Sequence, residues 1–303
     1  SAQTGFRNPT TQDLFIGLDA GRAVLVGSAP ANLDRDIRSY ELSQAGRDIT
    51  GSATTTVIGR AAYENAWDAL ALAGGTFQAI ETPVVQPEEI VAYEVGYRAK
   101  IDRFVIDMNA YYNQYDNFIS GGFVQVPLYG NVFGTAQEQG LAQLAVANGD
   151  SRTYQTYTNS PQEINSYGAN IGVDTKVSGF DLGFNYTYTK LEDAEQLRAQ
   201  GIRTNFNTPE HRFKASFGHT ELFKNFGFGI NYRWSDSYFW EASFQDGVID
   251  SFSVLDAQVN YAVPSIKSVF KLGGANILND EYVTAFGTGN VGAIYYISWS
   301  INP

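Results

Sequence analysis

Hydrophobic and polar residues alternate with a strict period of two in many segments of the chain. From Phe180 to Tyr188 every even position is Phe, Leu or Tyr, while the odd positions are Asp, Gly, Asn and Thr. Since successive side chains of a β-strand point to opposite faces, each such segment predicts a strand with one apolar and one polar face. The same alternation runs through residues 91–97, 104–112, 167–173, 213–217, 226–234, 255–261 and 295–301.

The length of these segments and the chemistry of their faces distinguish two kinds of all-β protein. A soluble antiparallel sandwich also alternates, but its strands average about five to six residues, whereas a tilted strand needs about 9 to 11 residues to cross a bilayer. The segments here are long, with Tyr and Trp near the ends of the apolar faces and Gly, Asn, Asp and Arg on the polar faces. Aromatic girdles and a wet lumen have this composition, so the pattern favours a transmembrane antiparallel β-barrel.

The connections between the expected strands alternate between short and long. The short joins are residues 101–102, 178–179, 223–225 and 263–267. The long joins are residues 16–86, 120–162, 192–207, 242–250 and 279–292. Outer-membrane barrels have short periplasmic turns and longer extracellular loops, so we expect the long joins, above all 16–86 and 120–162, to be extracellular. With a partial strand before Pro9, the chain supplies about ten strands, an even number as such barrels require.

Composition narrows the chemistry that the chain can perform. It has no Cys, so it can perform no thiol chemistry and cannot bind a metal through Cys. It has only two His, His211 and His219, so few side chains could form an ordinary Ser-His-Asp triad. The net charge of −12 argues against a nucleic-acid partner, because phosphate binding is driven by Lys and Arg. We expect no cofactor and no metal site, and no apolar stretch is long enough to predict a transmembrane helix.

Several short segments resemble, in the same order, sequences of the TonB-dependent outer-membrane receptors. The first is residues 5–15, which read GFRNPTTQDLF. The others are residues 86–89 (QPEE), 93–98 (YEVGYR), 109–113 (NAYYN), 167–173 (YGANIGV), 207–212 (NTPEHR) and 275–282 (ANILNDEY). Each segment is short, and their common order makes the resemblance specific.

The resemblance implies that residues 1–303 are the C-terminal part of one plugged barrel of roughly 22 strands. It implies that the plug domain and the first dozen or so strands lie outside this chain, on the same polypeptide or on another. It also implies a multi-pass location in the outer membrane, surrounded by lipid, and contact with the TonB complex through the plug region. The implied function is energy-coupled uptake of a nutrient, without covalent chemistry, in which this chain supplies barrel wall and ligand-binding loops.

Aromatic residues in the long joins are the candidate substrate-binding residues. They are Tyr238, Phe239, Trp240 and Phe244, at the outer end of a strand and in the following loop, and Tyr154 and Tyr157 in the join 120–162. Aromatic faces suit sugar rings and apolar groups, although such residues also form the girdle of a barrel. The join 16–86 predicts a short helix over residues 59–72, whose apolar face would form a lid or dock a partner.

Two other classes of outer-membrane protein stay open at this point. About ten strands can close a small self-contained porin. A rim-active outer-membrane enzyme would need His and carboxylate side chains gathered at one end of the barrel. Over the large loops, a surface lipoprotein lid of the SusD kind is a further candidate partner.

Overall fold

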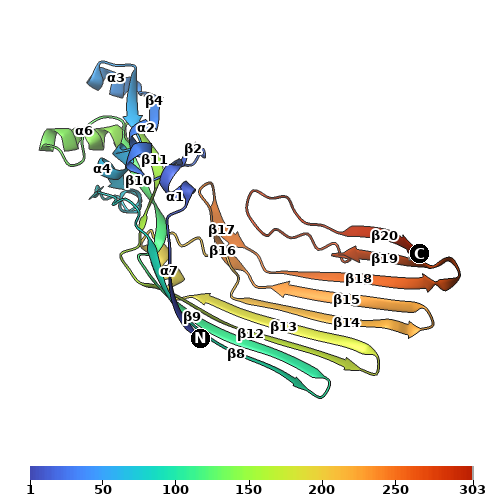
Figure 1. Ribbon diagram of the computed structural model, residues 1–303. Helices are drawn as coiled ribbons and strands as arrows, with labels where there is room; N and C mark the ends of the chain where they lie inside the picture. The colour runs from blue at the N-terminus through green and yellow to red at the C-terminus, as the bar shows by residue number, and fades with distance from the viewer. Residues whose placement is uncertain (302–303) are drawn as a thin grey trace.

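One antiparallel sheet of ten strands dominates the computed structural model, which describes residues 1–301 (Figure 1). The strands lie in the sheet in the order in which they occur along the chain. They are β1 (Ala2–Arg7), β8 (Glu88–Ile101), β9 (Phe104–Asp116), β12 (Ile164–Val177), β13 (Phe180–Leu191), β14 (His211–Phe223), β15 (Phe226–Ser235), β18 (Phe252–Val263), β19 (Ser268–Ala275) and β20 (Ile294–Ile301).

The two faces of this sheet have the predicted chemistry and register. Phe184 lies opposite Val173 in the pair β12–β13 and opposite Ala215 in the pair β13–β14, so the apolar face continues from strand to strand. The neighbouring Asn185 points to the polar face, since side chains alternate along a strand. Phe184 and Ile297 are 46% and 81% exposed, and an apolar surface of this extent requires apolar surroundings.

Short turns lie at one end of the sheet and long connections at the other, as predicted (Figure 1). The turn between β12 and β13 consists of Ser178 and Gly179, with φ angles of 51° and 86°. Positive φ at both central residues is the geometry of the tight hairpin turns that match the twist of paired strands. The turn between β18 and β19 contains the 3-10 helix η1 (Pro264–Ile266).

The sheet is open at both edges. Within the described residues, β1 pairs only with β8 and β20 pairs only with β19. A self-contained ten-stranded barrel would require β1 to pair with β20, so that alternative is wrong. Unpaired edge strands leave backbone donors and acceptors free, which in a membrane must be satisfied by further strands.

The two longest connections fold together into one compact unit, which we call the module. It contains a six-stranded sheet and a separate two-stranded hairpin. The strands of the six-stranded sheet are, in order, β2 (Gly17–Asp19), β3 (Val24–Val26), β11 (Ser151–Asn159), β10 (Ile119–Pro127), β6 (Ala66–Asp68) and β7 (Ala79–Ile80). The hairpin consists of β4 (Ile37–Glu41) and β5 (Thr54–Ile58). Since β3 pairs with β11 and β6 pairs with β10, the first connection is joined to the second by backbone hydrogen bonds.

Six short helices complete the module. They are α1 (Thr11–Phe15), α2 (Pro30–Arg35), α3 (Gln44–Thr50), α4 (Ala61–Glu64), α5 (Ala69–Ala73) and α6 (Ala136–Ala147). The predicted helix over residues 59–72 is wrong, because β6 separates α4 from α5. Ala66 and Trp67 are buried there and pair with Ile80 and Ala79 of β7, so strand pairing overrides the local helical pattern. No helix in residues 1–301 has the length and apolar character needed to cross a membrane.

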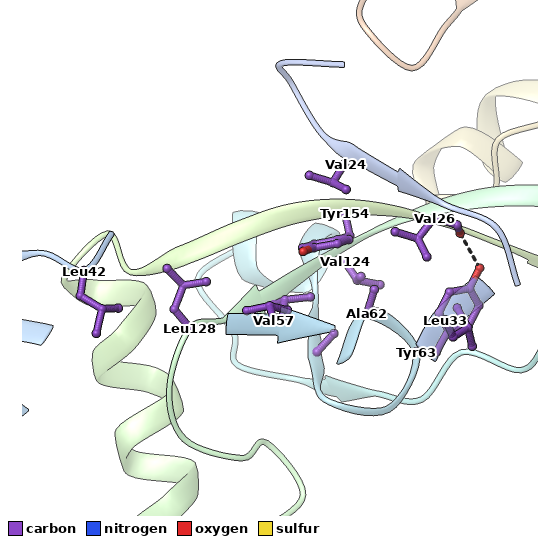
Figure 2. Packing of buried hydrophobic residues seen from close by; sticks show 12 residues of the cluster. Val24, Val26, Leu33, Leu42, Val57, Ala62, Tyr63, Val124, Leu128 and Tyr154 are labelled. Atoms are coloured by element: carbon purple, nitrogen blue, oxygen red, sulfur yellow. Dashed lines mark hydrogen bonds between the residues drawn. The ribbon is translucent and has the colours of Figure 1, made fainter. Parts of the chain in front are cut away.

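The module has its own hydrophobic core, built from both connections (Figure 2). Val26 from the first connection and Val124 from the second are 0% and 2% exposed. Burying a side chain of this kind contributes about 1.5–3 kcal/mol. Tyr63 crosses the core, where its hydroxyl donates to the carbonyl of Val26 at 2.9 Å and accepts from the backbone N–H of Tyr157 at 3.0 Å. Burial raises the pKa of Tyr63, so this hydroxyl stays protonated as a donor.

Two of the segments that resemble receptor sequences meet where the module joins the sheet. Arg7 donates to the carboxylate of Glu88 at 2.9 Å, and the backbone N–H of Ile119 donates to the same carboxylate at 2.8 Å. Glu88 is only 5% exposed, so these donors supply hydrogen bonds that bulk water does not reach. Thr10 and Asp13 form a reciprocal capping box at the start of α1. These residues therefore support the fold around the first connection.

Candidate functional site

A cavity of about 730 Å³ lies between the module and two further connections. Its walls come from β10, β11 and α5 of the module and from the connection 192–210, which contains α7 (Ala194–Ala199). The remaining wall is the hairpin of β16 (Tyr238–Glu241) and β17 (Asp246–Ile249). All four connections start from the same end of the sheet, and a cavity of this size is typical of small-molecule sites.

One wall of the cavity carries two arginines that share one carboxylate. Arg203 donates to both carboxylate oxygens of Asp246, at 3.0 and 2.6 Å, and Arg22 donates to one of them at 2.8 Å. Burial by itself raises the pKa of Asp246, but hydrogen bonds from Arg203 and Arg22 outweigh it and lower that pKa to about 2. The cluster therefore holds two positive charges and one negative charge.

One aromatic ring contacts both arginines in addition to the carboxylate. The guanidinium carbons Cζ of Arg22 and Arg203 each lie 4.8 Å from the ring centroid of Phe123 on β10. A cation over an aromatic face gains about 0.5–2 kcal/mol. Arg203 is 7% exposed and also donates to the carbonyl of Ala242 at 3.1 Å. Three connections thus meet around Phe123.

A second polar cluster ties the hairpin to the connection 192–210. Glu241 is 6% exposed and accepts from the backbone N–H of Asn205 at 2.8 Å. The side chain of Asn207 donates to the carbonyl of Glu241 at 2.9 Å and accepts from its N–H at 2.7 Å. Arg198 lies over the ring of Phe239, with 3.8 Å between Cζ and the centroid. The hairpin is therefore held on this side by both backbone and side-chain contacts.

The structure brings the four aromatic residues predicted near β16 onto this one hairpin. Tyr238 and Phe239 line a smaller hollow of about 370 Å³, which shares Arg198 with the main cavity. The indole N–H of Trp240 is buried and has no hydrogen-bond partner within residues 1–301. Phe244 is 50% exposed at the hairpin end. Their contact with substrate stays a prediction.

The other two predicted aromatic residues lie inside the module. Tyr154 is 0% exposed, and its hydroxyl shares a hydrogen bond of 3.0 Å with that of Tyr40. Tyr157 is 6% exposed, and its hydroxyl accepts from the side chain of Gln12 at 3.3 Å. Burial raises the pKa of both tyrosines. Both rings are buried on β11, an internal strand of the six-stranded sheet, and Tyr157 also lines a small hollow. Their contact with substrate stays a prediction.

Both imidazoles lie on the apolar face of the ten-stranded sheet. In the pair β13–β14, His211 is opposite Tyr188 and His219 is opposite Phe180. The ring of His219 meets Phe180 edge to face, with centroids 4.8 Å apart. Among residues 1–301, no group of three or more His, Asp or Glu side chains could hold a metal ion. The arrangement that a rim-active enzyme would need, with His and carboxylates together, is not formed by these two residues.

The residues of the arginine cluster were missed by sequence reasoning. Arg22 and Asp246 are 224 positions apart, and Arg203 and Asp246 are 43 apart. No local spacing or motif links them, since each lies in a different connection. Only the folding of the module beside the hairpin brings them together.

The chain matches the family model described as TonB dependent receptor-like, beta-barrel, over residues 1–279. Among similar solved structures is the pyoverdine outer membrane receptor FpvA from Pseudomonas aeruginosa bound to pyoverdine, with 11% identity and a TM-score of 0.50 over 71% of this chain and 30% of that one. Another is the FrpB iron transporter from Neisseria meningitidis, with 12% identity and a TM-score of 0.47 over 71% of this chain and 31% of that one. A third is the ferric enterobactin receptor PfeA from Pseudomonas aeruginosa, with 14% identity and a TM-score of 0.49 over 71% of this chain and 31% of that one. The chain thus spans about 30% of the length of these structures. No curated protein matches it.

A ten-stranded antiparallel sheet with one apolar face, short turns at one end and folded connections at the other is the wall of a transmembrane β-barrel. The family match covers most of that wall, and the chain belongs to the TonB-dependent receptor β-barrel family. It is therefore part of an outer-membrane β-barrel, and the resemblance carried by the short sequence segments is confirmed.

Proposed function

We propose that this chain forms part of the wall and the extracellular ligand-binding connections of a transporter that takes up a nutrient across the outer membrane. Membership of the receptor family is the observation that carries this proposal. Further strands and a plug complete the barrel, of which residues 1–303 are the C-terminal part. Energy is coupled through contact of the plug region with TonB, and lipid covers the apolar face.

The position of the cavity supports the proposed role of the connections. Four connections from one end of the sheet enclose it, and two of them are stabilised as a folded module. A binding site held by a rigid scaffold orders its ligand at lower entropic cost than a site on free loops. We include Tyr238 and Phe239 in the ligand-binding surface, since they line the adjoining hollow. A surface lipoprotein lid over the module stays a prediction.

The placement of the histidines favours transport over rim-active catalysis. His211 and His219 share the apolar face with Phe213, where barrel side chains meet lipid. General acid–base chemistry needs such a group within hydrogen-bond reach of the substrate.

The proposal is tested by following solutes that cells remove from a defined medium. We compare the source strain with a strain lacking the complete receptor and a strain lacking TonB, using mass spectrometry of the medium. We expect at least one solute to be depleted by the source strain and left by both mutants. Depletion that persists without TonB would overturn energy-coupled uptake.

A matched pair of variants tests the aromatic surface. Phe239→Ala in the complete receptor removes a ring beside the cavity, whereas Phe133→Ala removes a half-exposed ring of the module away from it. We expect the first to raise the half-saturating concentration of the depleted solute and the second to leave it unchanged. Equal effects would exclude Phe239 from the ligand-binding surface.

A further inference from the structure

The arginine cluster of the cavity carries one excess positive charge and has donors that are free for a ligand anion. Arg22 and Arg203 together carry two positive charges, and Asp246 supplies one negative charge. The side chain of Arg22 is 43% exposed and has one hydrogen bond, to Asp246, so most of its five donors are free for a ligand. A carboxylate could take the place of Asp246 at these donors, and a phosphate group with two negative charges would in addition balance both arginines.

Both guanidinium groups have an aromatic contact besides their bonds to Asp246. The ring of Phe123, which lies outside the hairpin, is 4.8 Å from each of them. The bond from Arg203 to the carbonyl of Ala242 is a contact with the hairpin itself. Two like charges held this close, with one of them buried, require an anion beside them. This requirement can be met by any oxyanion that reaches the pair.

Asp246 belongs to a wall of the cavity that is not part of either larger sheet. The strands β16 and β17 pair only with each other within the described residues and form no part of the ten-stranded sheet. Asp246 holds this hairpin to the module through Arg22. If another anion took its place, the hairpin would lose that contact.

The other carboxylates that line the cavity are engaged elsewhere or exposed. Asp68 accepts from the backbone N–H of Ala71 at 2.8 Å and caps α5. Glu241 accepts from the backbone N–H of Asn205. Glu81 is exposed to solvent at the end of β7. Asp246 is therefore the carboxylate that neutralises the arginine pair.

We propose that Arg22 and Arg203 bind a carboxylate or phosphate group of the ligand, and that Asp246 occupies this site when the cavity is empty. The ligand displaces Asp246 from the arginines and releases the hairpin of β16 and β17 from the module. The site thus selects ligands that carry an oxyanion and couples their binding to a movement of the cavity wall. The identity of this ligand as a transported nutrient rests on the proposed function.

Hydrogen exchange of the complete receptor in detergent tests the displacement. Citrate is the carboxylate probe, inorganic phosphate is the phosphate probe, and glucose is the neutral control. We expect citrate or phosphate, but not glucose, to speed exchange of the hairpin amides 238–249 and to protect residues 198–204. The probe that acts identifies which oxyanion the site prefers.

Three variants separate the site from a general effect of charge. Asp246→Asn removes the competing charge but keeps one acceptor. We expect the active probe to bind about tenfold more tightly, because a tenfold change in affinity corresponds to the free energy of about one charge-assisted hydrogen bond. Arg22→Gln removes a half-exposed guanidinium group and should weaken binding of the active probe by a similar factor. Asp250→Asn, which removes the same charge from an exposed position beside the hairpin, should leave binding unchanged.

Two outcomes would overturn the proposal. One is that neither probe binds the wild type or the Asp246→Asn receptor, and the other is that Asp250→Asn tightens binding as much as Asp246→Asn. Solute depletion by strains with and without TonB is measured separately. TonB-dependent depletion without any probe binding would leave the proposed uptake standing and refute the arginine site alone.

Discussion

Phe217 lies at the middle of β14, where an arginine would reveal which face of the sheet meets lipid. It is the central residue of the 13-residue strand His211–Phe223. Its ring lies 5.3 Å from the rings of both Phe180 and Phe228, and the side chain is 40% exposed on the apolar face. Ser216, the preceding residue, points to the polar face and lies opposite Gly183.

The expected costs of the two substitutions differ widely. An arginine on the lipid face near the midplane costs about 2–4 kcal/mol, and each lost aromatic pair about 0.5–1.5 kcal/mol. Phe217→Arg should therefore lower the free energy of unfolding by about 3–7 kcal/mol, at least a hundredfold in the equilibrium. In Ser216→Arg the new side chain faces water and reaches across Gly183 toward Asp174. This substitution should therefore lower the free energy of unfolding by no more than about 1 kcal/mol.

The assay is denaturant unfolding of the complete receptor in lipid vesicles, followed by tryptophan fluorescence and by mobility of the folded form on gels. Phe217→Leu serves as a control, since it keeps an apolar side chain and should cost less than the arginine. Equal losses for Phe217→Arg and Ser216→Arg would refute the assigned faces. A larger loss for Ser216→Arg would reverse them.

Further predictions concern the module and its contacts. Tyr63→Phe leaves a buried N–H and a carbonyl without a partner, so it should destabilise the module by about 1–3 kcal/mol, and unchanged hydrogen exchange there would contradict this. Glu88→Gln removes the buried charge that Arg7 binds, so residues 2–7 should exchange faster while β20 is unaffected. The pKa of Asp246 is lowered from 3.8 to about 2, so its tether is complete above about pH 4 and is lost as the pH falls toward 2. Limited proteolysis of the hairpin should follow that curve, and cleavage that rises between pH 7 and 5 would contradict it.

The ten-stranded sheet was predictable because each strand has one apolar face and one polar face. Alternation from Phe180 to Tyr188 fixes which side chains face each way, and a shift of one residue would invert both faces. The pair β12–β13 has the register that this requires, with Phe184 opposite Val173. Turn chemistry adds independent information, since Ser178-Gly179 suits a two-residue hairpin.

The module was not predictable from local pattern because its strands from the first connection are short, and two of them pair with strands of the second connection. β3 has three residues, is buried throughout and pairs with β11 more than a hundred positions away. Such a segment has no polar face to alternate with, so nothing local distinguishes it from a loop. Tyr154 has the aromatic character of a binding residue, but β11 lies inside the sheet of the module and the side chain packs in its core.

The candidate site lies beyond local prediction for a related reason. The cluster forms only when Arg22, Arg203 and Asp246 come together, and each lies in a different connection. A single arginine in a polar connection predicts a solvated side chain, because that is where most arginines lie. Burial of Arg203 follows from the packing of its connection against β10 and the hairpin.

The register of the sheet explains why two long connections can fold as one module. Arg7 pairs with Glu88, so β1 and β8 hold the ends of the first connection side by side. Tyr115 pairs with Ile164, so β9 and β12 do the same for the second connection. Because β8 and β9 are themselves neighbours, both connections start from four adjacent strands. The sheet has already brought the chain ends together, and the remaining entropic cost of closure grows only slowly with length. Pairing of β10 with β6 and of β11 with β3 is therefore a local event in space, although it is distant in sequence.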